Sequence, residues 1–318
     1  MGFFLKQGLS KGNRMEVGIG ICAYNEEKNI GYLLESILCQ NLRKIKIKEI
    51  FIVSDGSTDK TDSIVRGFIS LDEKVKLVTM EQRSGKWVSI NKFLEIAVSP
   101  ILVLASADII LDKYAIENLC SSFIYEEKLG IACSRPVPVN SMDYFMGYVA
   151  NLQWYLHHVL SKVKPKFCEL IAFRNVINRL PPTLVDEEYI GYIVRDKGYA
   201  SRYIPESIFF NKGSENLRDF IVQRKRIYLG HLLFKERYNY QVITLKAMNI
   251  LKCLFKNLPA DYKYNILWLF GAVFIEWIAR VFGSMDFYFR KNAVDYKWDT
   301  AGTTKKLMNN GKSLVSKL

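Results

Sequence analysis

The chain has 318 residues, 49% of them hydrophobic and 13% aromatic, so it is long and apolar enough to bury a substantial core. Its formal charge of +13 predicts a surface that attracts anions, and nucleic acid, anionic lipid and nucleotide phosphates are all possible partners. The six cysteines are scattered, without a C-x-x-C pair or partnering histidines. This spacing argues against a disulfide framework or a zinc site and favours reduced thiols in a cytosolic setting.

Four short apolar runs predict buried strands, at residues 17–23, 49–53, 75–78 and 101–105. The first three are each followed by a polar loop and then by apolar residues at helical spacing. Asn25 is the expected N-cap of the first of these helices. The alternation of short strands and helices predicts an α/β fold with a parallel sheet and crossover helices.

The polar loops that follow the four strands read AYNEE (23–27), VSDGSTD (53–59), QRSGK (82–86) and SAD (106–108). In open parallel sheets, ligands bind beyond the carboxyl ends of the strands. All four loops are expected at that edge, so their convergence predicts a binding site more strongly than any one loop does alone.

The second half of the chain is less regular, and its apolar segment at residues 266–285 is about as long as a membrane span, which needs roughly 20 residues. Glu276 and Arg280 lie inside this segment, and each would cost about 2.5 to 3.5 kcal/mol near a bilayer centre unless the two pair at i, i+4. A helix lying on the membrane or packed on the domain fits as well. Basic residues flank the segment, so the sequence favours membrane association and leaves its mode open.

Six segments resemble, in chain order, the motifs of family 2 glycosyltransferases: AYNEEKNI, VSDGSTDKT, GKWVSIN, SAD, DEEYIGYIVRDKGY and QRKRI. The resemblance implies the Rossmann-like GT-A fold and transfer of a sugar from a nucleotide-sugar with inversion, assisted by Mn²⁺ or Mg²⁺. It also implies a domain plan with an N-terminal extension (1–15), a GT-A domain (16–235), an apolar helical membrane-associated region (236–300) and a basic C-terminal tail (301–318).

The same resemblance assigns nucleotide-sugar contacts to eleven residues: Ala23, Tyr24, Asn25, Glu26, Asp55, Gly85, Lys86, Ser106, Ala107, Asp108 and Arg226. Asp55 would accept hydrogen bonds from the base or ribose, although helix capping is an alternative role for Asn25 and Asp55. Lys86 would contact the diphosphate, and Asp108 would hold the metal. Ser106 stands where the family usually has the first acid of D-x-D, which could weaken metal binding.

The acidic triplet Asp186-Glu187-Glu188 is similar to the segment that supplies the family's general base. The general base removes the proton from the acceptor hydroxyl. Glu187 takes the base position, with Asp186 or Glu188 as substitutes; a helix-start acid cluster is the alternative. The resemblance further places three residues at the acceptor: Glu169, Arg174 and Gln223. Ile227 replaces the family's tryptophan, and His231 is expected to be a packing or surface histidine.

Together these features predict a glycosyltransferase that uses a nucleotide-sugar, with a UDP-sugar favoured, and acts on a lipid-linked or glycan acceptor. It would work at the cytoplasmic face of the cell membrane, either peripherally or with one C-terminal span. The alternatives are a polyprenyl-phosphate sugar synthase and a non-catalytic scaffold that binds nucleotide-sugar or lipid. No recognised nucleic-acid-binding motif supports a nucleic-acid partner.

Overall fold

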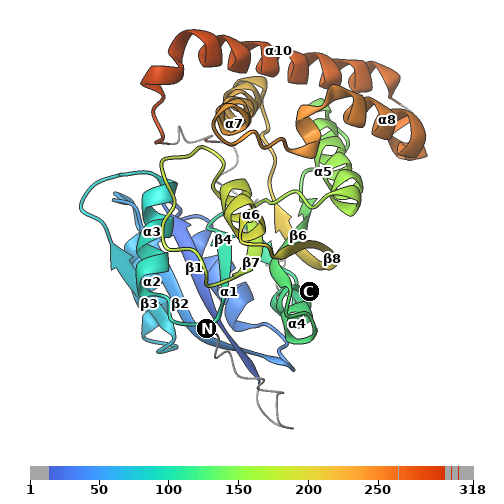
Figure 1. Ribbon diagram of the computed structural model, residues 1–318. Helices are drawn as coiled ribbons and strands as arrows, with labels where there is room; N and C mark the ends of the chain where they lie inside the picture. Colours follow the sequence, from blue (N-terminus) through green and yellow to red (C-terminus); the bar gives the residue numbers. More distant parts are fainter. Residues whose placement is uncertain (1–13, 264, 298–301, 303–306, 308–318) are drawn as a thin grey trace.

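The computed structural model describes residues 14–263, 265–297, 302 and 307, and an eight-stranded sheet forms its centre (Figure 1). The strand order is β3-β2-β1-β4-β7-β6-β8-β5. The strands are β1 (Met15–Ala23), β2 (Ile45–Ser54), β3 (Val75–Thr79), β4 (Ile101–Ser106), β5 (Ile110–Leu111), β6 (Leu129–Pro138), β7 (Leu170–Arg174) and β8 (Ala200–Asn211). Residues 1–13 of the expected N-terminal extension, and all of the expected C-terminal tail except residues 302 and 307, lie outside the described part.

The four predicted strands are confirmed as β1 to β4, and they pair in parallel. Ile19, Ile21 and their neighbours are fully buried because both faces of this part of the sheet carry helices. Farther along the sheet, β7 runs antiparallel to β4 and β6, and β5 runs antiparallel to β8. The sheet is therefore mixed, and the expected α/β class is confirmed.

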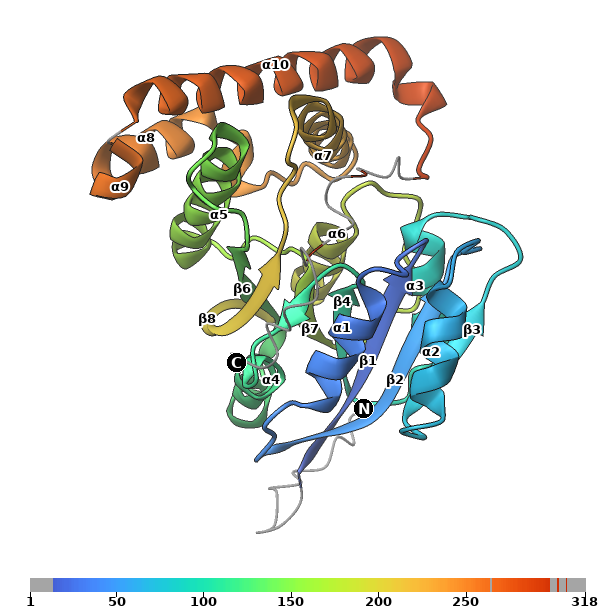
Figure 2. The same cartoon turned by 180° about the vertical axis from the view of Figure 1, so that it is seen from behind.

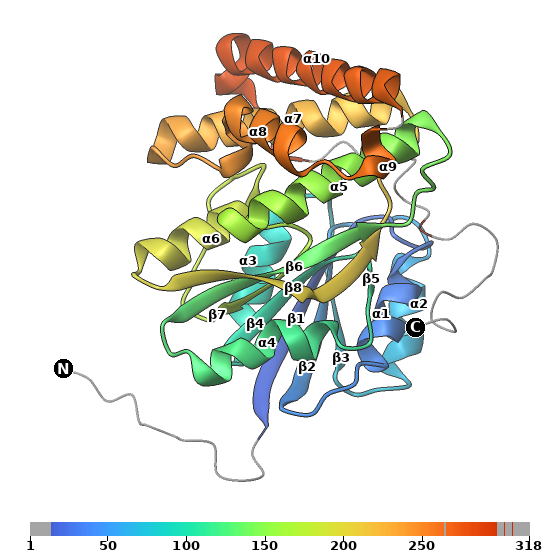
Figure 3. The same cartoon turned by 90° about the vertical axis from the view of Figure 1, so that its right-hand side faces the viewer.

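Five helices cover the two faces of the sheet (Figure 3). One core cluster joins β1 to α1 (Ile30–Leu38), α2 (Thr61–Ile69) and α4 (Ala115–Tyr125). A second cluster joins the opposite face to α3 (Lys86–Ile96) and α6 (Asp186–Asp196). The three crossover helices expected from the sequence are present as α1, α2 and α3.

The remaining helices form a layer over the carboxyl ends of β1 to β4 (Figures 1 and 2). They are α5 (Phe145–Val163), α7 (Leu217–Tyr238), α8 (Ala247–Asn257), α9 (Ala260–Lys263) and α10 (Ile266–Arg290), with short 3₁₀ turns η1 (Ile243–Leu245) and η2 (Lys291–Ala293). A third core cluster, which includes Tyr148 of α5, Phe220 of α7 and Ile275 of α10, holds this layer together. The loops at the sheet edge therefore face a helical wall rather than open solvent.

Helix α10 packs against α7 (Figure 1), and charged side chains join the two helices at several points. Glu276 accepts two hydrogen bonds from Arg224, each 2.8 Å long, and a third from Arg280 at 2.9 Å. Lys225 pairs with Asp286 at 2.8 Å. The charges inside the apolar segment thus face the protein, and Glu276 and Arg280 form the i, i+4 pair expected from the sequence.

The outer face of α10 is apolar and exposed: Leu267, Phe270, Phe274, Tyr288 and Phe289 are 58–82% accessible to solvent. Its inner face buries Ala272, Ala279 and Gly283, and a Cβ at Gly283 would lie 2.9 Å from the backbone oxygen of Lys225 in α7. Within the described part of the chain, α10 with the turn that follows is the one helix whose length and composition would suit a membrane span.

Candidate active site

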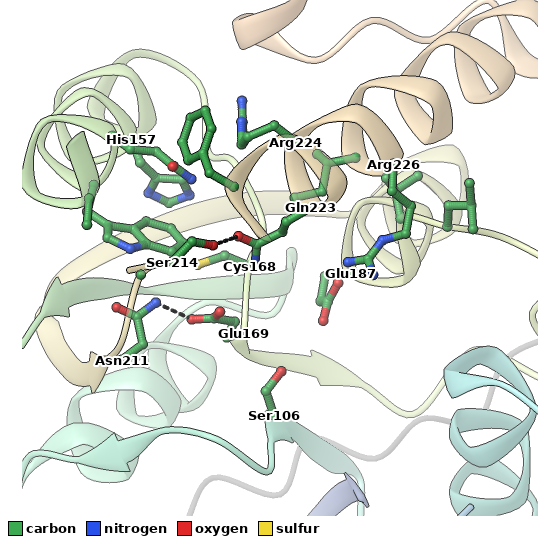
Figure 4. Close-up of a pocket in the computed structure, with 18 of the residues that line it drawn as sticks. Ser106, His157, Cys168, Glu169, Glu187, Asn211, Ser214, Gln223, Arg224 and Arg226 are labelled. Carbon is green, nitrogen blue, oxygen red and sulfur yellow. Dashed lines mark hydrogen bonds between the residues drawn. The ribbon is translucent and has the colours of Figure 1, made fainter. Parts of the chain in front are cut away.

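A cavity of about 510 Å³ lies between the loops at the sheet edge and the helical layer (Figure 4). Its floor comes from the ends of β1 and β4 and from the start of α3. Its other walls come from α5, α6, α7 and α10 and from the segments before β7 and after β8. The convergence of AYNEE, VSDGSTD, QRSGK and SAD at one edge of the sheet is therefore observed, since residues of all four loops line the cavity.

The loops after β1 and β2 are bound to each other by hydrogen bonds. Asn25 adopts a left-handed backbone with φ of 52°, and its Oδ1 accepts a 2.8 Å hydrogen bond from the backbone N–H of Thr58. The N–H of Glu26 donates to the hydroxyl of Thr61 at 2.8 Å, and that of Glu27 donates to Asp59 at 3.1 Å. These bonds make the two loops one unit along the donor side of the cavity.

Two predictions for Asn25 are corrected by this arrangement. Helix α1 begins only at Ile30, so Asn25 is not its N-cap. Asn25 is also absent from the cavity lining, whereas Ala23, Tyr24 and Glu26 line it. The side chain of Asn25 joins the two loops through its hydrogen bond with Thr58.

Asp55 is 5% exposed and holds the QRSGK loop in place. One carboxylate oxygen accepts a 2.7 Å hydrogen bond from the N–H of Ser84, and the other accepts one at 2.8 Å from Gly85. Glycine is required at position 56, because its φ is 68° and a Cβ there would lie 2.6 Å from the backbone nitrogen of Arg83. Asp55 lines the cavity, and a carboxylate has about four lone-pair sites, so it keeps acceptor capacity for a ligand.

Lys86 and Glu187 form an ion pair inside the cavity, with 2.5 Å between Nζ and Oε1. Lys86 Nζ also lies 3.5 Å from the hydroxyl of Ser106. Burial is the largest single influence and would raise the pKa of Glu187, but the charge and hydrogen bond of Lys86, together with a backbone hydrogen bond and the charge of Arg226, hold this pKa below its usual range. Burial would lower the pKa of Lys86, but the Glu187 and Asp186 carboxylates raise it instead. Both groups are therefore charged near neutral pH.

The other two acids of the triplet occupy different positions. Asp186 is fully buried, neither of its carboxylate oxygens has a hydrogen bond among the described residues, and it does not line the cavity. Burial raises the pKa of Asp186 to about 7, and the neighbouring Glu187 adds to that rise. Glu188 lines the cavity but accepts a 3.1 Å hydrogen bond from the N–H of Phe167. The geometry therefore favours Glu187 over Asp186 as the acid that reaches a substrate.

Asp108 and Glu169 are two carboxylates on the same wall of the cavity. Burial and then the charge of Asp108 raise the pKa of Glu169 to about 8, while Asn211 donates a 2.6 Å hydrogen bond to its Oε2. A divalent cation would relieve the repulsion between these carboxylates, so the pair fits such an ion. Among the residues that the structure describes, no group of three or more His, Cys, Asp or Glu side chains comes together.

The remaining predicted residues divide into two groups. Ala107, Arg226 and Gln223 line the cavity, and Figure 4 shows Arg226 pointing toward Glu187. Arg174 lies elsewhere, which corrects its assignment to the acceptor. Strand β7 runs antiparallel to β4 and carries Arg174 to the far end of the sheet, opposite Ile101. There its guanidinium donates to the carbonyls of Leu129 and Glu126.

Several cavity residues were not assigned a role from the sequence: Lys166, Phe167, His157, Asn211, Arg224 and Trp277. His231 is 5% exposed and also lines the cavity. These residues are spread over some 120 positions, and all except Arg224 lie on segments with no motif around them. Arg224 alone had a signal, since it belongs to the QRKRI segment.

Residues 19–169 match the family model described as glycosyl transferase family 2. The chain carries a family 2 glycosyltransferase domain. The matched range holds the loops around Asp55, Lys86 and Asp108 and ends at Glu169. The resemblance seen in the sequence is thus confirmed, and the chain is an enzyme of the glycosyltransferase class.

Solved structures support the GT-A fold of this glycosyltransferase. A mannosyltransferase from Pyrobaculum calidifontis, in complex with GDP-Man and Mn²⁺, superposes with a TM-score of 0.64 at 17% identity, covering 88% of this chain and 89% of that one. A glucosyl-3-phosphoglycerate synthase from Mycobacterium tuberculosis, in complex with Mn²⁺, UDP and its product, gives a TM-score of 0.50 at 16% identity, covering 73% and 83%.

A curated relative is the poly-beta-1,6-N-acetyl-D-glucosamine synthase of Staphylococcus aureus (strain COL). It is 24% identical over 134 residues, which are 42% of this chain and 31% of that protein. The match spans about a third of the length of this relative, so the likeness concerns the glycosyltransferase domain and not the rest of the synthase.

Proposed function

We propose that this protein is an inverting, metal-dependent glycosyltransferase that moves a sugar from a nucleotide-sugar to a hydroxyl of a lipid-linked or glycan acceptor at a membrane surface. One observation carries the proposal: Lys86, Asp108 and Glu187 come from α3, from the end of β4 and from α6 and meet in one cavity. An inverting transfer needs a cation for the diphosphate, an acid for a metal and a base for the acceptor, and these three residues supply them.

The ion pair between Lys86 and Glu187 defines a resting state of the base. While Glu187 is bound to Lys86, its lowered pKa makes it a weak proton acceptor. A nucleotide-sugar diphosphate would compete for the ammonium of Lys86 and release the carboxylate of Glu187. The base would then become effective only once the donor is bound, which limits transfer of the sugar to water.

A divalent cation held by Asp108, with Glu169 beside it, would stabilise the negative charge of the departing nucleotide. Three side chains of the protein would have further roles in binding. Asp55 fixes the loop that presents Lys86, Arg226 adds positive charge near Glu187, and Gln223 lines the acceptor side. Mn²⁺ and Mg²⁺ both suit an oxygen-rich site of this kind.

Membrane association through α10 is part of the proposal, and the contacts of α10 favour a helix that lies on the membrane over one that spans it. To span a bilayer, α10 would have to leave α7, and Arg224 would then lose both hydrogen bonds to Glu276. Breaking a buried ion pair costs about 3–5 kcal/mol. In the plane of the membrane, α10 can keep these bonds and bury its exposed aromatic face among the lipids.

The test of the proposed activity begins with the donor. A panel of UDP- and GDP-sugars, each with Mn²⁺, would be screened for protection against thermal unfolding, since a ligand at 100 times its Kd stabilises by about 2.7 kcal/mol. A UDP-sugar is favoured by the family resemblance and should give the largest rise in Tm. The protecting donor would then be assayed for release of its nucleoside diphosphate. If no donor in the panel protects the protein, the proposed function is wrong.

A further inference from the structure

The cavity extends past the catalytic residues into the helical layer, and its two parts differ in character. The helical layer contributes apolar side chains to the lining, with Leu152 and Leu156 of α5, Ile227 of α7 and Leu254 of α8. Figure 4 shows His157 and Arg224 above Cys168 and Glu169, on the side of the cavity away from Ser106. This deeper part lies away from the sheet-edge loops that are proposed to bind the nucleotide, so it can hold a second ligand group.

The mouth of the deeper part lies on α10. Val273 and Trp277 both line the cavity, and they are also exposed to solvent, by 43% and 58%. These two residues share the outer surface of α10 with Phe270 and Phe274. The apolar chain of a ligand in the cavity could therefore leave directly onto the face of the protein that is proposed to meet lipid.

Positive charge is concentrated inside this apolar region. Lys166, Arg224 and Arg280 line it with three positive charges, against the two carboxylates of Glu188 and Glu276. Glu276 is already bonded to both guanidiniums, and Glu188 accepts from the backbone of Phe167. Burial lowers the pKa of Lys166 even though Glu188 acts against that shift. Counted as three cationic side chains against two carboxylates, the region has an excess of one positive charge.

Two buried histidines complete the region. Burial and then the charge of Lys166 lower the pKa of both His157 and His231 well below the usual value, so both rings are neutral near pH 7. His231 is 5% exposed, and its Nδ1 has no hydrogen-bond partner in the described part of the chain. A buried polar atom without a partner is costly, and a ligand that bonds to it would remove that cost.

Resting on the proposed function, we infer that the deeper cavity binds the acceptor as an amphiphile, with a phosphate or diphosphate headgroup beside Lys166, Arg224 and His231 and an apolar chain that leaves past Val273 and Trp277. Phosphate oxygens are the acceptors that an ammonium and a neutral imidazole N–H can bond together. A neutral glycan would leave the excess positive charge of this pocket unmatched. The membrane then supplies the acceptor laterally, through the face of α10.

The test uses isothermal titration of the whole protein with UDP and Mn²⁺ at saturation, so that the donor site is filled. Three probes share parts of the expected ligand: farnesyl diphosphate has both chain and headgroup, farnesol has the chain alone, and inorganic pyrophosphate has the headgroup alone. We expect farnesyl diphosphate to bind at least tenfold more tightly than either of the others. Equal affinity for farnesol would overturn the headgroup site, and equal affinity for pyrophosphate would overturn the amphiphile.

Substitution of the lysine locates the headgroup. Lys166→Gln removes the charge at similar length, and it should weaken farnesyl diphosphate about tenfold or more while the affinity for farnesol stays the same. Lys166→Arg should restore most of the loss. Lys162→Gln, an exposed lysine of α5, is the matched control and should change nothing. If Lys166→Gln binds farnesyl diphosphate as tightly as the wild type, the assignment fails; if UDP itself does not bind to the wild type, the proposed function fails instead.

Discussion

The two walls of the cavity are built in opposite ways. The sheet-edge wall consists of short loops whose polar groups are bonded to each other, as in Asp55 with Ser84 and Gly85. The helical wall consists of long helices with an apolar surface and a few buried charges, held by ion pairs between α7 and α10. The first wall suits a hydrophilic donor whose groups all need partners. The second suits a ligand that is mostly apolar with one charged end.

This difference separates two tasks that a sugar-transferring enzyme must combine. In the proposed function the sheet-edge wall binds the donor and is called the donor wall here. It must hold its loops in fixed positions, and hydrogen bonds between the loops do so. In the proposed function the helical wall binds the acceptor and needs access to a membrane, which the exposed apolar face of α10 would provide. Glu187 and Lys86 lie where the walls meet, and each belongs by sequence to a different half of the domain. Variants on either wall should therefore affect different steps.

The largest effect is expected at the junction of the walls, for Glu187→Gln. Losing the base should lower kcat for transfer about 10²- to 10⁴-fold, while UDP should bind at least as tightly, because Lys86 is no longer paired with the Glu187 carboxylate. Steady-state kinetics together with UDP titration would separate the two quantities. The neighbouring Asp186→Asn is the control, since Asp186 does not line the cavity and should retain most of the activity. Equal loss in both variants would contradict the assignment of Glu187.

A smaller loss is expected on the donor wall for Asp108→Asn. The variant should lower kcat about hundredfold and raise the Mn²⁺ concentration needed for half-maximal activity, because a metal ligand has lost its charge. Titration of Mn²⁺ at a fixed donor concentration would measure both changes. Asp112→Asn is a matched control, since this acid follows β5 and is not part of the cavity lining. An unchanged metal requirement in Asp108→Asn would remove Asp108 from the metal site.

On the helical wall, the double variant Phe270→Glu and Phe274→Glu should weaken binding to liposomes with anionic lipid at least tenfold. Each phenylalanine contributes about 1.5–3 kcal/mol when it moves from water into an apolar environment. Flotation of the protein with vesicles would measure the loss, and the Kd of UDP should stay the same. Leu71→Glu, at another exposed apolar residue beyond α2, serves as the control. Equal flotation of the wild type and the double variant would exclude α10 as the membrane contact.

The smallest effect is a change in stability with pH at Asp186. Its pKa is raised to about 7 in the folded protein, so the folded state binds a proton more readily than the unfolded chain does. Stability from this group is present at low pH and is lost as the pH rises from about 4 to about 7. Asp186→Asn should therefore raise Tm at pH 8 by about 2 °C or more, and the gain should shrink toward pH 4. A constant gain at every pH would contradict the raised pKa.

The donor wall could be predicted from the sequence because its signals are local. Each loop follows an apolar strand, and the parallel arrangement fixes where the loops meet. The structure corrected details that depend on the backbone: α1 begins only at Ile30, so Asn25 is not its N-cap, and the antiparallel β7 places Arg174 at the far end of the sheet. The helical wall could not be predicted, since Lys166, His157 and Trp277 are brought together only by the packing of α5, α7 and α10.

The position of α10 has a kinetic consequence. Packed helices have axes about 8–10 Å apart, and α7 lies directly beneath α10, so Gln223 and Arg226 on α7 would work close to the lipid headgroups. An enzyme held in this way encounters its acceptor by diffusion in two dimensions. Its rate would follow the mole fraction of acceptor in the bilayer, and adding inert lipid at constant total acceptor would slow it once the protein is bound. A single encounter with the membrane could then support many rounds of transfer before the protein dissociates.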